Sequence, residues 1–300
     1  MKIVLLGASG QIGGQLLRSL APLGQLVALG RAEADFTAPE QTLAAVARQQ
    51  PDVIVNAAAY TAVDRAESEP ALARCINATT PGLLARWAAQ HGALLVHYSS
   101  DYVFDGSGSR PWREDDAPAP LSSYGHSKHA AEALIAQAGG PHLVLRTSWV
   151  YAAQGQNFAQ TILRLAQQRP CLTVVNDQWG APTGADWLAE VTAQAIVHLL
   201  RRPQDGGLYH CTAAGATTWC DYAALVLAQA RQSALAAKIK TTALLPVPSS
   251  AYPTAAQRPH NSRLDCGRLQ AVFGFAPPPW QDGVARMLAH ILHCPEGSRP

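Results

Sequence analysis

The 300-residue chain has little charge, because only 15% of its residues are Asp, Glu, Lys or Arg, whereas an average soluble domain has about 25%. Its 23 basic and 21 acidic side chains nearly cancel, and no basic cluster stands out along the chain. The concentrated positive charge with which proteins bind nucleic acid is therefore missing. We expect a small-molecule partner and no nucleic acid.

Long apolar runs are also missing. No stretch reaches the roughly 18 residues that cross a bilayer, and glycines from Gly7 onward end the apolar N-terminal run after residues 3–6. That run is too short for the apolar core of a signal peptide and fits a buried first strand better. We expect a cytoplasmic protein with no membrane partner.

The six cysteines are scattered along the chain, with no C-x-x-C pair and no paired histidine spacing. This pattern favours neither a disulfide framework nor a metal site. Free thiols in a reducing compartment are the simplest interpretation. None of the cysteines lies in a recognisable nucleophile setting.

Short runs rich in Val, Leu and Ile alternate with Ala- and Gln-rich segments over the first half of the chain. The apolar runs are nearly continuous, as in strands buried on both faces, and predict strands at 3–6, 26–29, 53–55, 94–98 and 143–145. The segments between them predict helices at 11–20, 39–49, 70–90 and 124–137. This alternation predicts an α/β fold with a Rossmann-type, doubly wound parallel sheet.

The second half of the chain changes character, because prolines gather after residue 245. A sixth strand at 172–175 and a helix at 186–200 continue the first pattern, and a short strand at 208–211 opens the proline-rich part. We predict a dinucleotide-binding domain over 1–150, with a return segment at about 172–205. The smaller, interleaved C-terminal substrate domain is predicted from 151–171 and 206–300, with a frayed tail at 295–300.

The segment 7–13 reads GASGQIG and lies between the first predicted strand and the first predicted helix. In such a turn Gly7 allows a tight reversal, Gly10 lets the backbone approach a pyrophosphate, and Gly13 lets helix and strand pack closely. The spacing is GxxGxxG rather than GxGxxG, and an ordinary glycine turn is the alternative. Its place between strand and helix favours a dinucleotide.

The end of the second predicted strand is where such folds distinguish the ribose hydroxyl of NADH from the 2′-phosphate of NADPH. No acid stands at Gly30, and Arg31 either faces a 2′-phosphate or is an ordinary surface arginine. Asp35 and Phe36 are candidates to cover the adenine. NADPH and NADH both stay open as cofactors.

Tyr124 and Lys128 are four residues apart, so a helix places their phenol and ammonium groups on one face. A phenol with its ordinary pKa near 10 is a poor acid at neutral pH. A neighbouring cation lowers that pKa, which lets the pair pass a proton to a substrate oxygen. With eight tyrosines and four lysines in the chain, this spacing arises by chance only about 0.1 times.

Ser100 and Asp101 follow the fourth predicted strand, at the edge where ligands bind in open parallel sheets. A serine there can donate to a carbonyl oxygen, and an aspartate can accept from sugar hydroxyls. Taken alone, the same residues fit an ordinary turn.

Together, the glycine turn, this serine and the Tyr-x-x-x-Lys spacing resemble the extended short-chain dehydrogenase/reductase family. Further segments resemble the dTDP-4-dehydrorhamnose reductase family, so that the likeness runs from residue 1 to about 290; they are 56–64, 98–104, 146–151, 176–183 and 258–264. The resemblance implies an enzyme that uses NADPH or NADH to reduce the 4-keto group of dTDP-4-dehydro-L-rhamnose. This reaction is the last step of dTDP-L-rhamnose formation.

The resemblance also implies roles for single residues. Tyr124 is the proton donor, Lys128 holds the nicotinamide ribose, and Ser100 assists them. The sugar is contacted by Ser100, Asp101 and Trp149. The cofactor positions, including those argued above, are Gly7, Gly10, Gln11, Ile12, Gly13, Gly30, Arg31, Asp35, Phe36, Ala59, Tyr60, Thr61, Tyr124 and Lys128.

The chain departs from the family pattern at one implied metal site. Family members with a magnesium-bridged dimer use three glutamates, and the matching positions here are Gln15, Asp186 and His290. The sequence therefore predicts no metal, and a monomer or a homodimer.

Two alternatives stay open. Another nucleotide-sugar reductase, epimerase or dehydratase would share the fold, but the dehydratases have a glutamate where Tyr102 stands, and the fucose-type reductase-epimerases a cysteine where Asp101 stands. A non-catalytic regulatory subunit would keep the fold and bind dinucleotide. The complete set of Tyr124, Lys128 and Ser100 favours an enzyme.

Overall fold

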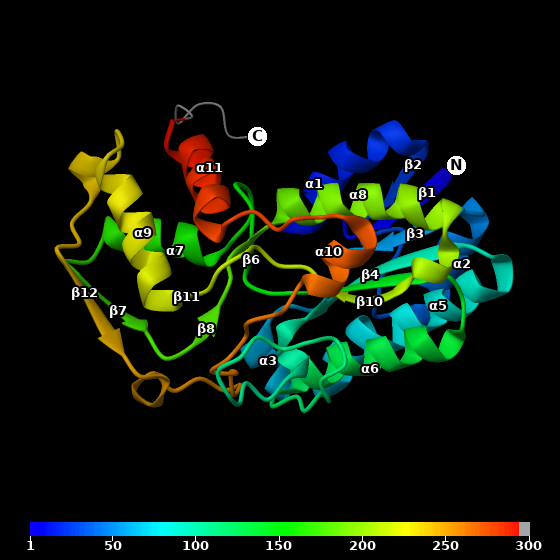
Figure 1. The fold of residues 1–300 in the computed structure, drawn as a ribbon, viewed down its shortest axis with the longest axis horizontal. Helices are drawn as coiled ribbons and strands as arrows, with labels where there is room; N and C mark the ends of the chain where they lie inside the picture. Colours follow the sequence, from blue (N-terminus) through cyan, green and yellow to red (C-terminus); the bar gives the residue numbers. More distant parts are fainter. Residues whose placement is uncertain (294–300) are drawn as a thin grey trace.

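Six parallel strands form the central sheet of the computed structural model, which describes residues 1–293 (Figure 1). Their order is β10-β5-β4-β3-β1-β2, so the chain reverses direction across the sheet between β1 and β3. In doubly wound folds this reversal opens the ligand crevice. The predicted α/β, Rossmann-type sheet is confirmed. The strands are β1 (Lys2–Leu6), β2 (Gln25–Leu29), β3 (Val53–Asn56), β4 (Leu94–Ser100), β5 (His142–Thr147) and β10 (Gly207–His210).

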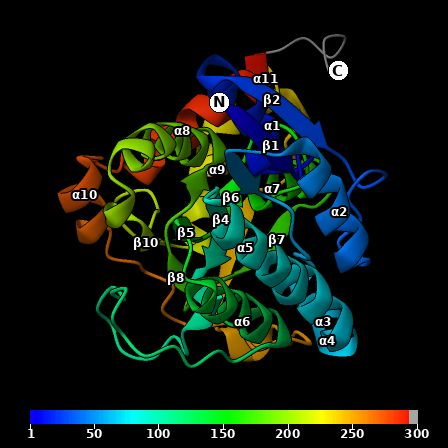
Figure 2. The ribbon, with the colours of Figure 1, turned by 90° about the vertical axis from the view of Figure 1, so that its right-hand side faces the viewer.

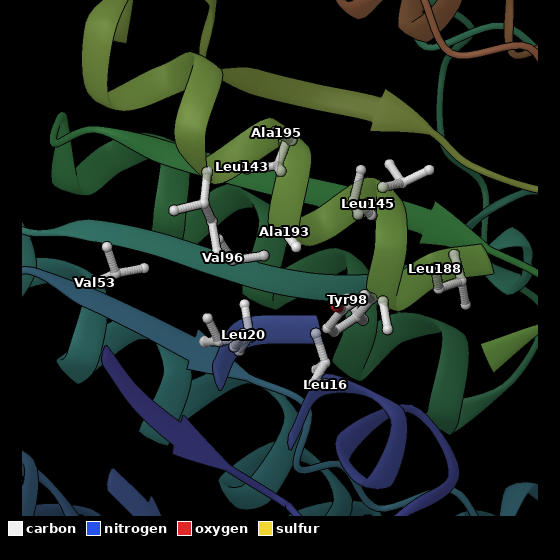
Figure 3. Packing of buried hydrophobic residues seen from close by; sticks show 14 of the residues in the cluster. Leu16, Leu20, Val53, Val96, Tyr98, Leu143, Leu145, Leu188, Ala193 and Ala195 are labelled. Atoms are coloured by element: carbon white, nitrogen blue, oxygen red, sulfur yellow. The ribbon is translucent and has the colours of Figure 1, made fainter. Parts of the chain in front are cut away.

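Helices cover both faces of this sheet, as the two views in Figures 1 and 2 show. One layer consists of α1 (Gln11–Leu20) and α8 (Ala185–Arg201), and the other contains α2 (Pro39–Gln49), α5 (Thr80–His91) and α6 (Ser123–Ala138). Alternate strand residues point to the two layers. Ile3 and Leu5 therefore pack with α1 and α8, whereas Val4 and Leu6 pack on the opposite side. Figure 3 shows the first of these cores, where Leu16 and Leu20 face Val53, Val96 and Leu143.

The predicted helix at 70–90 is interrupted. It consists of α4 (Pro70–Arg74), a π-helical turn η2 (Cys75–Thr79) and α5, and a short helix α3 (Val63–Ser68) precedes it. Pro81 has no N–H for the carbonyl of Asn77, and its ring would crowd that carbonyl in a regular α-helix. A π turn is a usual solution to such a conflict. It leaves the side chain of Asn77 buried beside the loop that follows β3.

Two strand predictions in the second half were assigned to the wrong sheet. The strand predicted at 172–175 is β7 (Cys171–Val175), and it pairs with β12 (Ala243–Val247) rather than with the central sheet. The strand predicted at 208–211 is β10, which pairs with β5 and buries Tyr209 in the central core. A short apolar run predicts a strand but does not say which sheet buries it. The predicted return segment at 172–205 thus contains β7, which is outside the central sheet, and omits β10, which belongs to it. The division into domains stays a prediction.

A second hydrophobic core lies beside β7 and β12, away from the central sheet (Figure 1). It packs residues of α7 (Phe158–Ala166), α9 (Trp219–Arg231) and α11 (Trp280–His293) together. The remaining elements are β6 (Val150–Tyr151), β8 (Trp179–Gly180), β9 (Thr183–Gly184), β11 (Thr217–Thr218), α10 (Gly267–Phe273) and the short helical turns η1 (Ala21–Leu23), η3 (Asp101–Val103), η4 (Pro203–Asp205), η5 (Ala236–Lys238) and η6 (Ser249–Ala251).

Within residues 1–293, none of the helices combines the length and apolarity needed to cross a membrane. The described cysteines are all free thiols, as predicted, and Cys211 and Cys220 are buried. Cys294 and the predicted frayed tail at 295–300 lie outside the described residues.

Candidate active site

A cavity of about 820 Å³ lies at the carboxyl ends of β1 to β5. Every residue predicted for the site lines this cavity except Gly13. That glycine is buried on α1, where an added Cβ would lie 2.0 Å from the carbonyl oxygen of Gly7. Gly13 therefore lets the helix pack onto the turn, which is the role that its place in the motif predicts.

The turn after β1 brings bare backbone to the cavity. Gly7 has a φ of +79°, and an added Cβ there would lie 2.5 Å from the backbone nitrogen of Ala58. At the N-cap of α1, Gly10 provides no side-chain hydrogen bond. The first N–H groups of a helix need acceptors, and an anion commonly supplies them. This part of the wall fits the pyrophosphate of a dinucleotide.

Gln11 connects this turn to the second half of the chain. Its Oε1 accepts from the backbone N–H of Ala152 at 2.9 Å and from Nδ2 of Asn157 at 3.2 Å. Gly155 and Gln156, which lie between these two partners in sequence, also line the cavity. A single amide thus holds the loop after β6 over the dinucleotide end of the site.

The start of α6 fixes Tyr124 in the cavity wall. Ser122 caps the helix by accepting from the Gly125 N–H at 3.1 Å. An added Cβ on Gly125 would lie 2.2 Å from the carbonyl oxygen of Tyr102, so the first turn of α6 packs directly on the segment after β4. This contact sets Tyr124 beside Ser100, whose hydroxyl is close enough to affect the pKa of the phenol.

Lys128 lies one helical turn beyond Tyr124, as predicted, and it is buried. Its Nζ donates to the carbonyl oxygen of Tyr98 at 2.5 Å. Burial lowers the pKa of Lys128 to about 8, although the nearby Glu132 carboxylate opposes this change. The ammonium therefore keeps most of its charge at pH 7 and loses it at a much lower pH than an ordinary lysine.

The pKa of Tyr124 differs from the expectation that the neighbouring Lys128 cation lowers it. Burial raises the pKa of Tyr124 to about 12, although the Ser100 hydroxyl opposes the rise. Desolvation of the phenolate outweighs other influences in this site. The phenol is consequently protonated at neutral pH, and it can give its proton to an alkoxide because an alkoxide is a stronger base than a phenolate.

Asp101 places a buried carboxylate next to this phenol. Its Oδ1 accepts from the Ser100 hydroxyl at 2.8 Å, whereas its buried Oδ2 has no hydrogen-bond partner within the described part of the chain. Burial raises the pKa of Asp101 to about 6, and the hydroxyls of Ser262 and Ser100 oppose the rise. A buried polar atom normally has a partner, so Oδ2 fits a hydroxyl donor on a ligand.

Asn77 holds together two parts of the wall and was missed in the sequence analysis. Its Oδ1 accepts from the Tyr60 N–H at 2.8 Å, and its Nδ2 donates to the Tyr60 carbonyl at 3.0 Å and to Ser127 Oγ at 2.9 Å. The loop carrying Ala59, Tyr60 and Thr61 is thereby held against α6. An asparagine ahead of a proline in a helical run was the available signal.

A buried ion pair supports the other side of α6. Arg146 donates from Nε and Nη2 to the Glu132 carboxylate at 2.8 and 2.7 Å, and Ser99 donates to the same carboxylate at 2.5 Å. Burial opposes the charge on Glu132, but hydrogen bonds led by Arg146 bring its pKa down to about 2. The pair fixes α6 against β4 and β5 and was not identified from the sequence.

Trp149 lines the cavity together with Trp219, which sequence reasoning missed. Their rings stack with centroids 3.5 Å apart and planes at 12°. Trp149 has a φ of +47°, and an added Cβ on Gly180 would lie 2.6 Å from its indole. The flat aromatic surface suits the face of a sugar ring.

The positions of the implied magnesium site do not form a site for a hard cation. Asp186 is the only carboxylate among the three, and its Oδ2 lies 3.9 Å from Arg286 Nη2. Gln15 offers a neutral amide and His290 a nitrogen, whereas magnesium prefers anionic oxygen ligands. No group of three or more His, Cys, Asp or Glu side chains suited to a metal occurs within residues 1–293. The residues present do not fit a magnesium bridge.

The chain matches the family model described as the RmlD substrate binding domain over residues 1–293. It is 51% identical over 296 residues to a dTDP-4-dehydrorhamnose reductase of Escherichia coli strain K12, covering 97% of this chain and 98% of that protein. The chain belongs to the dTDP-4-dehydrorhamnose reductase family. The resemblance inferred from its motifs is therefore confirmed.

Solved structures of dTDP-4-dehydrorhamnose reductases share the fold along nearly the whole chain. The Clostridium acetobutylicum structure gives a TM-score of 0.86 at 30% identity and covers 97% of this chain and 99% of its own. The Bacillus anthracis structure gives 0.85 at 32% identity, covers 96% and 99%, and holds NADP. The family thus includes a member with a dinucleotide bound in the same fold.

Proposed function

We propose that this protein reduces the 4-keto group of dTDP-4-dehydro-L-rhamnose to a hydroxyl with NADPH or NADH, giving dTDP-L-rhamnose. The observation that carries this proposal is the protonated phenol of Tyr124, which lies beside Ser100 in a cavity whose other end is a bare glycine turn. A reductase needs a proton donor at the place where an alkoxide forms. Membership of the dTDP-4-dehydrorhamnose reductase family supports the substrate class.

The dinucleotide would be held along the ends of β1, β2 and β3. The turn at Gly7 and Gly10 suits its pyrophosphate, the positions from Gly30 to Phe36 suit its adenosine, and Lys128 suits the nicotinamide ribose. The reduced nicotinamide supplies the hydride. The loop with Ala59, Tyr60 and Thr61 borders the path between these ends.

The chain's own residues handle the proton and the charge. As the C4 carbonyl gains a hydride, the oxygen becomes an alkoxide, and the Tyr124 hydroxyl transfers its proton to that oxygen. Lys128 stabilises the phenolate left behind. The Ser100 hydroxyl, once it turns from Asp101 toward the substrate oxygen, donates to the developing charge. The ketone has then gained one hydride and one proton, which completes the alcohol.

The sugar would be oriented by two further residues. Asp101 lines the cavity with a buried carboxylate, which can accept from a ring hydroxyl. The stacked indole of Trp149 offers a flat apolar face in the wall of the same cavity. The polar and aromatic walls together favour a sugar over an apolar substrate.

The dehydratase alternative lacks its second carboxylate. Tyr102 stands at that position, and its ring packs edge-on against Tyr124 with centroids 5.7 Å apart. Burial raises the pKa of Tyr102, so its phenol stays neutral and cannot serve as the base of an elimination. A regulatory subunit would not need Tyr124, Lys128 and Ser100 gathered in one cavity.

A coupled assay tests the proposal. Purified protein is mixed with enzymatically generated dTDP-4-dehydro-L-rhamnose and either NADPH or NADH. We expect the reduced nicotinamide to be consumed only when the keto-sugar nucleotide is present. Dinucleotide binding without such consumption would indicate the regulatory subunit instead. The cytoplasmic location and the monomeric or homodimeric state stay predictions.

A further inference from the structure

The carboxylate of Glu33 occupies the place where a side chain at residue 30 would project. The Gly30 N–H donates to Glu33 Oε2 at 2.9 Å. An added Cβ on Gly30 would lie 3.1 Å from the same oxygen. The end of β2 therefore has a carboxylate although Gly30 itself provides none.

A tight turn holds this carboxylate at the wall of the cavity. The N–H groups of Glu33 and Ala34 both donate to the Gly30 carbonyl, at 3.2 and 2.9 Å. Gly30 and Arg31 line the cavity. Glu33 does not line it, but its carboxylate lies 2.9 Å from the backbone nitrogen of Gly30. Both charged side chains of this turn, Arg31 and Glu33, are exposed.

The neighbouring charges on this turn have opposite signs. Arg31 contributes a cation that also acts on Asp35, where a hydrogen bond from the Thr37 backbone is the main reason that the pKa of Asp35 is lowered. Asp35 is thus already paired with Thr37. Glu33 is the acid whose carboxylate contacts the Gly30 backbone itself, and Arg31 is the cation next to Gly30 in the chain.

We infer that Glu33 sets the choice between the two dinucleotides. The inference rests on the proposed function, which places the adenosine ribose at the end of β2. The carboxylate can accept from the 2′-hydroxyl of NADH, and it repels the 2′-phosphate of NADPH. Arg31 acts in the opposite sense, because its guanidinium attracts a phosphate. Glu33 and Arg31 therefore shift the ratio of the two affinities in opposite directions.

The test compares two adenosine fragments that differ only at the 2′-position. Affinities of 2′,5′-ADP and 5′-AMP are measured by isothermal titration calorimetry on the wild type and on Glu33→Gln, whose amide oxygen still accepts from the Gly30 N–H. We expect Glu33→Gln to tighten 2′,5′-ADP binding about tenfold, because a like charge close by is removed. Binding of 5′-AMP changes little or weakens, and the gain shrinks as salt is added.

Glu40→Gln provides the matched control. Glu40 is an exposed acid in the first turn of α2, outside the turn that follows β2, so its loss should leave the ratio of the two affinities unchanged. If Glu33 only caps the turn, Glu33→Gln also leaves this ratio within about twofold of the wild type, and the inference is overturned. Absence of binding of NADPH, NADH and both fragments to the wild type would instead contradict the proposed function.

Discussion

Gly125 approaches Tyr102 so closely that a Cβ on this glycine would lie 2.2 Å from the Tyr102 carbonyl oxygen. The contact joins the first turn of α6 to the segment after β4, and it holds Tyr124 next to Ser100. The catalytic arrangement therefore depends on a missing side chain as much as on those present.

Gly125→Ala should disturb this contact. The added methyl group has no room, and overpacking of this kind costs about 1–3 kcal/mol in the free energy of unfolding. Because Tyr124 moves with the helix start, kcat should fall more than the affinity for dinucleotide. Denaturant unfolding and steady-state kinetics measure both effects. Gly14→Ala is the control, since the nearest atom to its added Cβ is 3.9 Å away. A Gly125→Ala protein with wild-type stability and rate would refute the close contact.

Tyr124→Phe should abolish most turnover while dinucleotide binding stays nearly intact. Only the proton-donating hydroxyl is lost, and general acid catalysis contributes about 10² to 10⁴ in rate. Turnover and NADPH affinity are measured on the same preparation. The exposed Tyr252 supplies a control through Tyr252→Phe. A Tyr124→Phe rate within about threefold of the parent would remove Tyr124 from the proposed role.

Lys128→Met should weaken dinucleotide affinity and lower kcat, because it removes both the ribose contact and the charge beside the phenol. It should also change how stability depends on pH. Between about pH 8 and the ordinary lysine value of 10.5, unfolded chains hold a proton on Lys128 that folded chains have released. The wild-type free energy of unfolding then rises with pH in this window, by up to about 3 kcal/mol from this group.

The Lys128→Met variant lacks this rise. Urea unfolding at pH 7.5 and pH 10 gives the change in the free energy of unfolding between these pH values for each protein. Titrating groups that both proteins share cancel when the two changes are compared. Equal pH dependence in the two proteins would show that burial does not shift the lysine pKa as described.

Arg31→Ala should reduce any advantage of NADPH over NADH. A hydrogen bond from a charged donor contributes about 1.5–3 kcal/mol, which limits the loss of NADPH affinity to roughly tenfold to a hundredfold. NADH affinity should change little. Arg48→Ala, which removes an exposed arginine from the last turn of α2, is the control. An unchanged ratio would make Arg31 an ordinary surface residue.

Magnesium should be dispensable for activity and for any dimer. Asp186 alone, next to Arg286, holds a hard divalent cation weakly. Light scattering after size exclusion and turnover are measured before and after exhaustive EDTA treatment. Dissociation or inactivation that magnesium reverses would overturn this prediction.

Local patterns were enough to predict most of the site. The glycine turn, the Tyr124–Lys128 spacing and Ser100 all follow from strand ends or from one helix, so their neighbours in sequence define their places. The parallel sheet then brings these ends together without further information. The same rule explains why the central strands from β1 to β5 were predicted correctly.

Contacts between distant segments could not be predicted in this way. Asn77 reaches Ser127 across 50 positions, and Trp219 at the start of α9 stacks on Trp149 in the segment between β5 and β6. The sheets of β7 and β10 depend on which core buries them, not on their own short apolar runs. The raised pKa of Tyr124 likewise depends on the depth of its burial, which spacing does not express.

Hydride transfer to the sugar C4 is the central claim, and isotopic labelling tests it directly. The protein is incubated with dTDP-4-dehydro-L-rhamnose and NADPH that has deuterium in its transferable position, and the product is analysed by NMR spectroscopy. The account predicts dTDP-L-rhamnose with one deuterium at C4, formed by the wild type and far more slowly by Tyr124→Phe. Deuterium at another carbon, or a product without deuterium, would contradict it.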